Sequence, residues 1–522
     1  MGDAGSESNG LTRKELIGSG AAAAATALLS QGAGTGVERA LAAPRDKRNV
    51  GGMNIVLFIS DQERAIQHFP KNWLRKHLPG MRRLRRHGIS FERAFTSACM
   101  CSPSRATMMT GFFPAQHGVK YTLEENMTRR TNPQVEMPLP SVMPNLATVM
   151  KAAGYNVIYK GKWHCSKPAQ GEDATPAELE KYGFDRWDPP DAGANQDVDQ
   201  AGGGTYDNDG RFMNSEGKGA AEGALQYLNS AAARQQPFFL VVSLVNPHDV
   251  LFYPEAFAKS GYEEEEENGE KWLEGEIRPP ATALEDLSTK PSAQEEFRNL
   301  MKASDEYLVD VLSALEANGL MDDTLVVRTS DHGEMGLAHG GMRQKNFNFY
   351  EETLRVPMVF SNPKLFPKPH TSDALVSHVD LLPTLASLVG APRSARRNWQ
   401  GVDYSSLVLR PNLKRSVQDY VVFTYDDYQS GQKHGPYPKP PNHVVSIREE
   451  RWKLAKYFDV DGNERPQWEM YDLKRDPLER INLAYEDHKR TPLQEREYRR
   501  LRRKLARVQK TRLKPLKRLG AS

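Results

Sequence analysis

The chain has 522 residues, of which 26% are charged and 39% are hydrophobic. At about 150 residues per domain, this length predicts two to four domains or one large domain with a smaller companion, and the apolar fraction is sufficient for a buried core. The formal net charge of +3 argues against a nucleic-acid binder that works through its overall charge. Three cysteines, Cys99, Cys101 and Cys165, are too few for a small domain stapled by disulfides.

Residues 1–43 have the order of an export signal. Arg13-Lys14 precedes a weakly apolar stretch over residues 16–29, and an Ala-x-Ala sequence ends the segment. The weak hydrophobicity and the basic pair resemble a twin-arginine signal with Lys in the second position. We therefore expect an exported protein; a disordered leader or a short surface helix is the alternative. No run of about 20 apolar residues is present, so we expect no membrane-spanning helix.

Four short apolar runs in the first two thirds of the chain are each followed by polar residues. They cover residues 54–60, 156–159, 237–243 and 324–329. Helical patterns lie between them, over residues 141–153, 220–232 and 293–317. This alternation predicts an α/β fold, in which a mainly parallel sheet is covered by helices on both faces. Open sheets of this kind bind ligands at the carboxyl ends of their strands.

The pattern changes after residue 415. Short strand-like segments at 419–424, 443–447, 452–458 and 469–473 predict a small antiparallel subdomain over residues 416–487. Residues 488–522 then form a basic tail, with 14 Lys and Arg against 2 Glu from residue 489 onward. Leu501, Leu505 and Val508 have helical spacing in this tail. Without it, the rest of the chain is net acidic, at −9.

The most specific motif is Cys101-Ser-Pro-Ser-Arg105, which is followed by Thr110-Gly111. Cys-x-Pro-x-Arg with Thr-Gly five residues after the Arg resembles the signature of the sulfatase family, and further blocks extend the resemblance from residue 52 to about residue 487. In that family the cysteine is oxidised to formylglycine, which implies a formylglycine-generating enzyme as a maturation partner. The resemblance also implies an alkaline-phosphatase-like fold, with residues 52–415 as the catalytic domain.

The resemblance implies nucleophilic catalysis on a small sulfated substrate. One hydroxyl of the hydrated aldehyde at residue 101, deprotonated and held by a metal, would attack sulfur and form a covalent sulfo-enzyme. The second hydroxyl would then lose its proton, and the hemiacetal would collapse to expel sulfate. Arg105, one helical turn after the nucleophile, would hold and orient the deprotonated gem-diol.

The metal ligands that the resemblance implies lie after two of the apolar runs. Many sulfatases carry Asp-Asp early and Asp-Asn late, whereas this chain has Asp61-Gln62 and Asp331-His332. This departure resembles the choline-sulfatase and phosphonate-monoester-hydrolase branch, in which Asp, Asp and His bind one divalent metal together with the formylglycine, here at position 101. Gln62 would be a peripheral ligand. The family favours Ca²⁺, and the histidine admits Mn²⁺; helix capping is the alternative role for the two carboxylates.

Three further blocks resemble sulfate-binding parts of the family. Lys162 and His164 lie two residues apart on an extended segment, so both point the same way. Lys162 would bind a sulfate oxygen, and His164 would remove the formylglycine proton in the elimination step. His248 and Lys345 would stabilise and protonate the leaving oxygen. Lys160 lies outside the pattern, and we expect it to be solvated.

The sequence therefore predicts an exported, metal-dependent sulfuric ester hydrolase. A phosphonate monoester or phosphodiester hydrolase on the same site is the first alternative. A non-catalytic binder of sulfated glycans, attached through the basic tail, is the second. Choline, aryl and sugar sulfates all stay open as substrates, because the loops that would read the alcohol carry no recognisable code.

Overall fold

The computed structural model describes residues 50–65, 69, 72–123, 137–166, 174–193, 208–214, 222–252, 292–336, 338–342, 344–430 and 437–516. The predicted export signal at residues 1–43 lies outside this part of the chain. Among the described residues, no helix is both long and apolar enough to cross a membrane.

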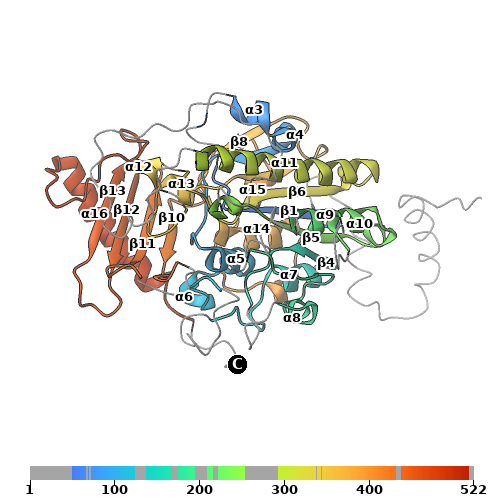
Figure 1. Cartoon of the computed structure of the whole chain (residues 1–522), viewed down its shortest axis with the longest axis horizontal. Coiled ribbons are helices and arrows are strands. Elements are labelled where there is room, and N and C mark those ends of the chain that lie inside the picture. Colours follow the sequence, from blue (N-terminus) through green and yellow to red (C-terminus); the bar gives the residue numbers. More distant parts are fainter. Residues whose placement is uncertain are drawn as a thin grey trace, which may run out of the picture.

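A seven-stranded mixed sheet forms the centre of the molecule (Figure 1). In spatial order its strands are β4 (Asn156–Gly161), β5 (Phe238–Pro247), β1 (Asn54–Asp61), β6 (Thr324–Ser330), β7 (Met358–Ser361), β2 (Gly88–Phe91) and β8 (His370–Ser372). The strand β7 runs antiparallel to both of its neighbours, and every other pair is parallel. The mainly parallel sheet expected from the sequence is confirmed.

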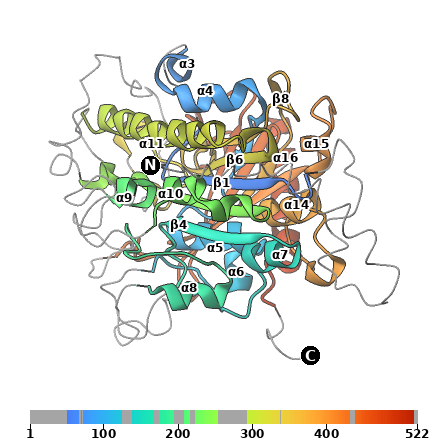
Figure 2. The same cartoon turned by 90° about the vertical axis from the view of Figure 1, so that its right-hand side faces the viewer.

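The central strand β1 is buried on both faces. Its side chains alternate: Ile55 and Leu57 belong to one hydrophobic core, and Val56 and Phe58 to the other. The first core is closed by α5 (Cys101–Thr110), α7 (Leu146–Ala152) and α14 (Leu381–Leu388). The second is closed by α4 (Pro79–Arg86), α10 (Ala224–Asn229) and α11 (Ser292–Ala317), which lie on the opposite side of the sheet in Figure 2.

Smaller elements complete this layer arrangement. The helices are α3 (Trp73–His77), α6 (Pro114–His117), α8 (Pro176–Tyr182), α9 (Asn208–Asn214), α12 (Ala338–Gly341), α13 (Glu351–Leu354) and α15 (Ser405–Leu409), and β3 (Ala94–Phe95) pairs with β9 (Val376–Ser377). The helix predicted from residue 141 begins only at Leu146. The cause is local, because the Asn145 side chain accepts hydrogen bonds from the backbone N–H groups of residues 147 and 148 and so caps the helix there.

The C-terminal part is a four-stranded antiparallel meander at one end of the molecule (Figure 1). Its strands are β10 (Tyr420–Tyr425), β11 (His443–Glu449), β12 (Trp452–Phe458) and β13 (Gln467–Asp472). The helix α16 (Pro492–Thr511) packs against one face of it, with Leu501, Leu505 and Val508 buried there. The helical spacing in the basic tail is therefore confirmed, and this helix covers the sheet.

The other face of the meander packs against the body. Phe423 and Tyr457 share a core with Cys99 and Met100, the two residues that lead into α5. The C-terminal sheet therefore supports the segment that carries Cys101.

Candidate active site

Cys101 is the first residue of α5, a helix whose ten residues are all buried. Pro103 lies in the first turn, where its missing N–H costs no helical hydrogen bond. Gly111 ends the helix with φ of +70°. Because the N-terminus of a helix carries a partial positive charge, residue 101 stands where an anion is favoured.

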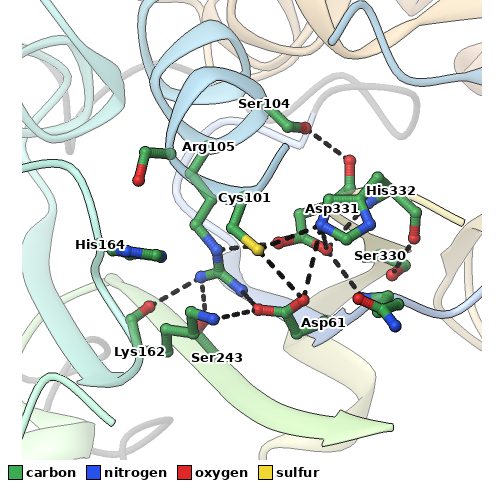
Figure 3. Close-up of polar contacts among 12 residues, drawn as sticks. Asp61, Cys101, Ser104, Arg105, Lys162, His164, Ser243, Ser330, Asp331 and His332 are labelled. Atoms are coloured by element: carbon green, nitrogen blue, oxygen red, sulfur yellow. Dashed lines mark hydrogen bonds and ion pairs between the residues drawn. The ribbon is translucent and has the colours of Figure 1, made fainter. Parts of the chain in front are cut away.

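Two acidic side chains and one histidine converge on Cys101 (Figure 3). Asp61 ends β1, and Asp331 and His332 follow β6; the two strands are parallel neighbours, so their carboxyl ends meet. Cys101 Sγ lies 3.2 Å from His332 Nε2 and 3.7 Å from Asp61 Oδ1. The ligating atoms of all four residues lie within 4.8 Å of one another, and all four residues are buried. Carboxylate oxygens and an imidazole nitrogen so close together fit a divalent cation.

Arg105 holds the two carboxylates from one side. Its Nε donates to Asp331 Oδ2 at 2.9 Å, and its Nη2 donates to Asp61 Oδ2 at 3.2 Å. The remaining nitrogen, Nη1, donates to the carbonyl oxygen of Lys162 at 2.8 Å and to Ser243 Oγ at 2.7 Å. This guanidinium therefore joins the end of β1, the middle of β5 and the residue after β6 to the segment that follows β4.

The charges shift the acidities of the buried groups. Burial pushes the pKa of Asp61 upward, but the charge of Lys162 and, to a lesser extent, that of Arg105 hold it well below its usual range. Lys162 Nζ lies 2.5 Å from Asp61 Oδ2. Burial and, next, the negative charge of Asp61 raise the pKa of the Cys101 thiol to about 11. An unmodified Cys101 is therefore a neutral thiol at neutral pH and a weak nucleophile.

A glycine directs the segment that carries Lys162 and His164. Gly161 has φ of +97°, and a Cβ there would lie 2.0 Å from the carbonyl oxygen of Ser243. Only glycine permits this close crossing over β5. Asp191 then accepts hydrogen bonds from the backbone N–H of Trp163 at 2.7 Å and of His164 at 2.8 Å. The His164 ring lies beside the Leu123 carbonyl, with 2.5 Å between Nε2 and O.

Lys345 and His248 are the last two predicted residues of the site. His248 follows β5 and is buried; burial lowers its pKa well below the usual range, and the charges of Asp61, Lys162 and Lys345 also act on it. The ammonium of Lys345 donates to the side-chain oxygen of Gln62. The side-chain nitrogen of Gln62 donates to Glu334 Oε2 at 2.5 Å.

The ten residues predicted from the motifs therefore come together in one region. Gln62 stands beside the carboxylates, since its backbone N–H donates to Asp331 Oδ1 at 3.0 Å. The expectation for Lys160 is wrong. Its side chain is 2% exposed, and its ammonium lies 3.3 Å from Asp188 and 3.5 Å from Glu222. Two carboxylates stabilise the charge of this lysine inside the protein, so it does not need solvent.

Sequence analysis missed three residues that hold the site in place. Ser243 accepts from Arg105, Asp191 fixes the turn after β4, and Glu334 holds Gln62. Ser243 was detectable in principle, because it is the polar end of the predicted strand over residues 237–243. Asp191 and Glu334 belong to no motif, and only the folded chain brings them to the site.

Comparisons with known proteins identify the family of this chain. The sulfatase family profile matches residues 53–391, and the profile described as N-sulphoglucosamine sulphohydrolase, C-terminal, matches residues 339–511. An ulvan-active sulfatase of Formosa agariphila is 26% identical over 442 residues, which are 82% of this chain and 76% of the relative. The choline-sulfatase of Rhizobium meliloti is 26% identical over 472 residues, which are 83% of each chain.

A solved structure supports the fold. The phosphonate monoester hydrolase of Silicibacter pomeroyi superposes with a TM-score of 0.60 and 20% identity, and covers 88% of this chain and 96% of that chain. The sulfatase family profile spans well over half of the residues of this chain and includes every predicted site position. This chain therefore belongs to the sulfatase family: it is a sulfuric ester hydrolase with an alkaline-phosphatase-like fold.

Proposed function

We propose that this enzyme hydrolyses sulfate monoesters with a formylglycine made from Cys101 and with one bound divalent metal ion. The observation that carries the proposal is the convergence of Cys101 with Asp61, Asp331 and His332, whose ligating atoms lie within 4.8 Å of one another in a fully buried site. Each buried carboxylate adds a desolvation cost, which a bound cation would offset.

Asp61, Asp331 and His332 would hold the ion, together with residue 101, and Gln62 would be a peripheral neighbour. Two carboxylates favour Ca²⁺, and the histidine admits Mn²⁺. When bound, the ion supplies positive charge that lowers the pKa of a nearby oxygen and offsets the charge of the sulfate.

The protein's own cations would read the sulfate and move the protons. Lys162, next to Asp61, would bind a sulfate oxygen. A residue 101 hydroxyl would form the bond to sulfur while the ester bond breaks, and His248 or Lys345 would protonate the departing alkoxide. His164 would then take the proton of the second hydroxyl, so that the aldehyde re-forms and sulfate leaves. Arg105 would keep the carboxylates and the Lys162 segment in register.

Mass spectrometry of the peptide that contains residue 101 tests the nucleophile. In active enzyme we expect this peptide to be about 18 Da lighter than the cysteine form. The variant C101A should lose aryl sulfate turnover, whereas C165A, which changes another buried free cysteine, should retain the lighter peptide and most of the turnover. An unmodified peptide from fully active protein would overturn the mechanism.

Metal dependence and substrate class need separate measurements. Chelation should abolish aryl sulfate turnover, and Ca²⁺ or Mn²⁺ should restore it. Turnover of an aryl sulfate and of a phosphate diester by the same preparation separates the two hydrolase activities. A large preference for the diester would favour the phosphonate or phosphodiester alternative, which uses the same nucleophile.

We also infer that residues 1–43 direct export through a twin-arginine-type route. The support is the basic pair Arg13-Lys14 ahead of a weakly apolar stretch. Replacing both residues with glutamine should leave the protein inside the producing cell, as cell fractionation would measure. Unchanged export of that variant would remove the twin-arginine assignment and leave the catalytic proposal intact.

A further inference from the structure

The helix α16 has a second face that the fold does not use. Leu501, Leu505 and Val508 point into the C-terminal sheet. On the opposite side, six exposed basic residues follow one another at intervals of three or four positions. This basic stripe consists of Arg496, Arg499, Arg503, Arg507, Lys510 and Lys514.

The spacing puts the stripe in a line. Residues three, four and seven positions apart lie on the same side of a helix, so the stripe is one side chain wide. From Arg496 to Lys510 it extends about 21 Å along the helix axis. Lys514 lies three residues beyond the end of α16 at Thr511 and is also exposed.

Other basic residues of α16 already have partners. The side chains of Arg500 and Lys504 form ion pairs with Glu449 on β11, and Arg502 lies over the ring of Trp468 on β13. These contacts attach the helix to the sheet. These contacts give a structural role to the basic residues beside the buried apolar face. They give none to the basic residues on the outer face.

Fewer carboxylates pair with the basic stripe than with the basic residues beside the buried face of α16. At its start, Arg499 pairs with Glu495, and Arg496 lies near Glu497. Within the described ranges, no carboxylate pairs with Arg503, Arg507, Lys510 or Lys514 (the free end of the stripe). The three like charges that lie on the helix, Arg503, Arg507 and Lys510, repel one another and lower its stability. A bound polyanion would remove that repulsion.

We propose that the basic stripe is a second binding surface of this sulfatase, and that it holds a linear sulfated polysaccharide. The inference rests on the proposed function, because it takes the sulfuric esters that the active site cleaves to be carried on a polymer. Sulfate esters stay ionised at every physiological pH, and the planar guanidinium matches their oxygen pairs.

The geometry favours a chain over a membrane. A helix that inserts into a membrane buries its apolar face in the lipid, but the apolar face of α16 is buried against the sheet. The exposed face presents a narrow line of charge rather than a broad plane. A single extended polyanion fits such a line, with one anionic group for each helical turn.

Binding of dextran sulfate by the full chain tests the stripe. The variant R503Q/R507Q/K510Q/K514Q should bind dextran sulfate at least about tenfold more weakly, with a shallower dependence on salt, because fewer counterions are released. The control R393Q/R397Q/R410Q/K414Q removes the same charge from other exposed positions and should bind as the wild type does. Uncharged dextran should bind to none of them.

Turnover of a small aryl sulfate separates the two proposals. It should be equal in wild type, stripe variant and control, since the stripe lies outside the active site. Equal loss of binding in both variants, or tighter binding of duplex DNA or phosphatidylserine vesicles than of dextran sulfate, would overturn the stripe proposal. Stripe-dependent binding by a wild type that cleaves no sulfate ester would instead overturn the proposed function.

Discussion

Two buried clusters of charge among the described residues are arranged differently. In the candidate active site, the ligating atoms of Asp61 and Asp331 converge with those of His332 and Cys101. In the second cluster, between the body and the C-terminal sheet, Glu351 and Glu479 are matched directly with cations, although Glu479 also lies near His339 and Glu352. Glu351 accepts two hydrogen bonds from Arg448, and Lys453 lies 2.6 Å from Glu479. Converging ligand atoms suit a bound group, whereas matched pairs connect two parts of a fold.

The acidities follow this division only in part, because burial raises the pKa of Glu479 to about 7 although Lys453 lies beside it. In the second cluster, burial raises the pKa of Glu351, but the charges of Arg448 and Lys453 overcome it and hold the pKa at about 2. Glu469 has no such match, and burial raises its pKa to about 7. In the candidate active site, the charges of Lys162 and Arg105 act together on Asp61 and keep it ionised. An ionised carboxylate of this kind suits a bound cation.

The largest effect should come from the converging carboxylates. The variant D61N removes a metal-ligand candidate and the partner of Lys162, so aryl sulfate kcat/KM should fall at least about a thousandfold. The control D185N breaks an exposed ion pair with Lys151 and should keep nearly full activity. Steady-state kinetics and metal content of the folded variants measure this. More than a tenth of wild-type activity in D61N would contradict the assigned role.

The variant R105K tests whether the guanidinium fork positions the carboxylates. Lysine keeps the charge but cannot reach Asp61, Asp331 and Ser243 together, so we expect kcat/KM to fall by about a hundredfold with the Cys101 modification still present. Kinetics and mass spectrometry of the same sample provide the measurement. Activity within about threefold of wild type would show that charge alone is sufficient.

The second cluster should affect stability rather than catalysis. The variant E351Q leaves Arg448 without its buried counter-charge and leaves Lys453 with Glu479 alone, so the free energy of unfolding should drop by about 3 kcal/mol. Activity per folded molecule should stay within about twofold. The control E92Q breaks the half-exposed pair with Arg85 and should cost less than about 1 kcal/mol. Urea unfolding measures the stability of both variants. Equal losses in E351Q and E92Q would show that the buried pair stabilises the fold no more than the half-exposed pair does.

The smallest effect should be a change in pH dependence. Glu469 has its pKa raised from 4.5 to about 7, so the folded protein retains a proton that the unfolded chain has released. Its contribution to stability is complete below pH 4.5 and is lost as the pH rises to about 7. The neutral variant E469Q should therefore lose stability less steeply across this window. If urea unfolding shows that stability falls with pH equally in wild type and E469Q, Glu469 is already deprotonated in the folded protein across this window.

Much of the fold could be predicted from the chain alone. Continuous apolar runs such as residues 54–60 predict strands buried on both faces, and β1 has that burial. The spacing of Leu501, Leu505 and Val508 predicts a helix with one buried face, and α16 is that helix. Boundaries were less accurate where a side chain decided them, as Asn145 does at the start of α7.

The sequence by itself determined the chemical types at the site. The resemblance to the sulfatase motifs was sufficient to select Cys101, Asp61, Asp331 and the basic residues around them, and the apolar runs placed the two aspartates at strand ends. Tertiary structure alone decided which residues support them. Asp191, Glu334 and the burial of Lys160 depend on contacts between segments far apart in the chain, and such contacts leave no local pattern. Burial then sets the acidities, since desolvation and neighbouring charge exist only in the folded protein.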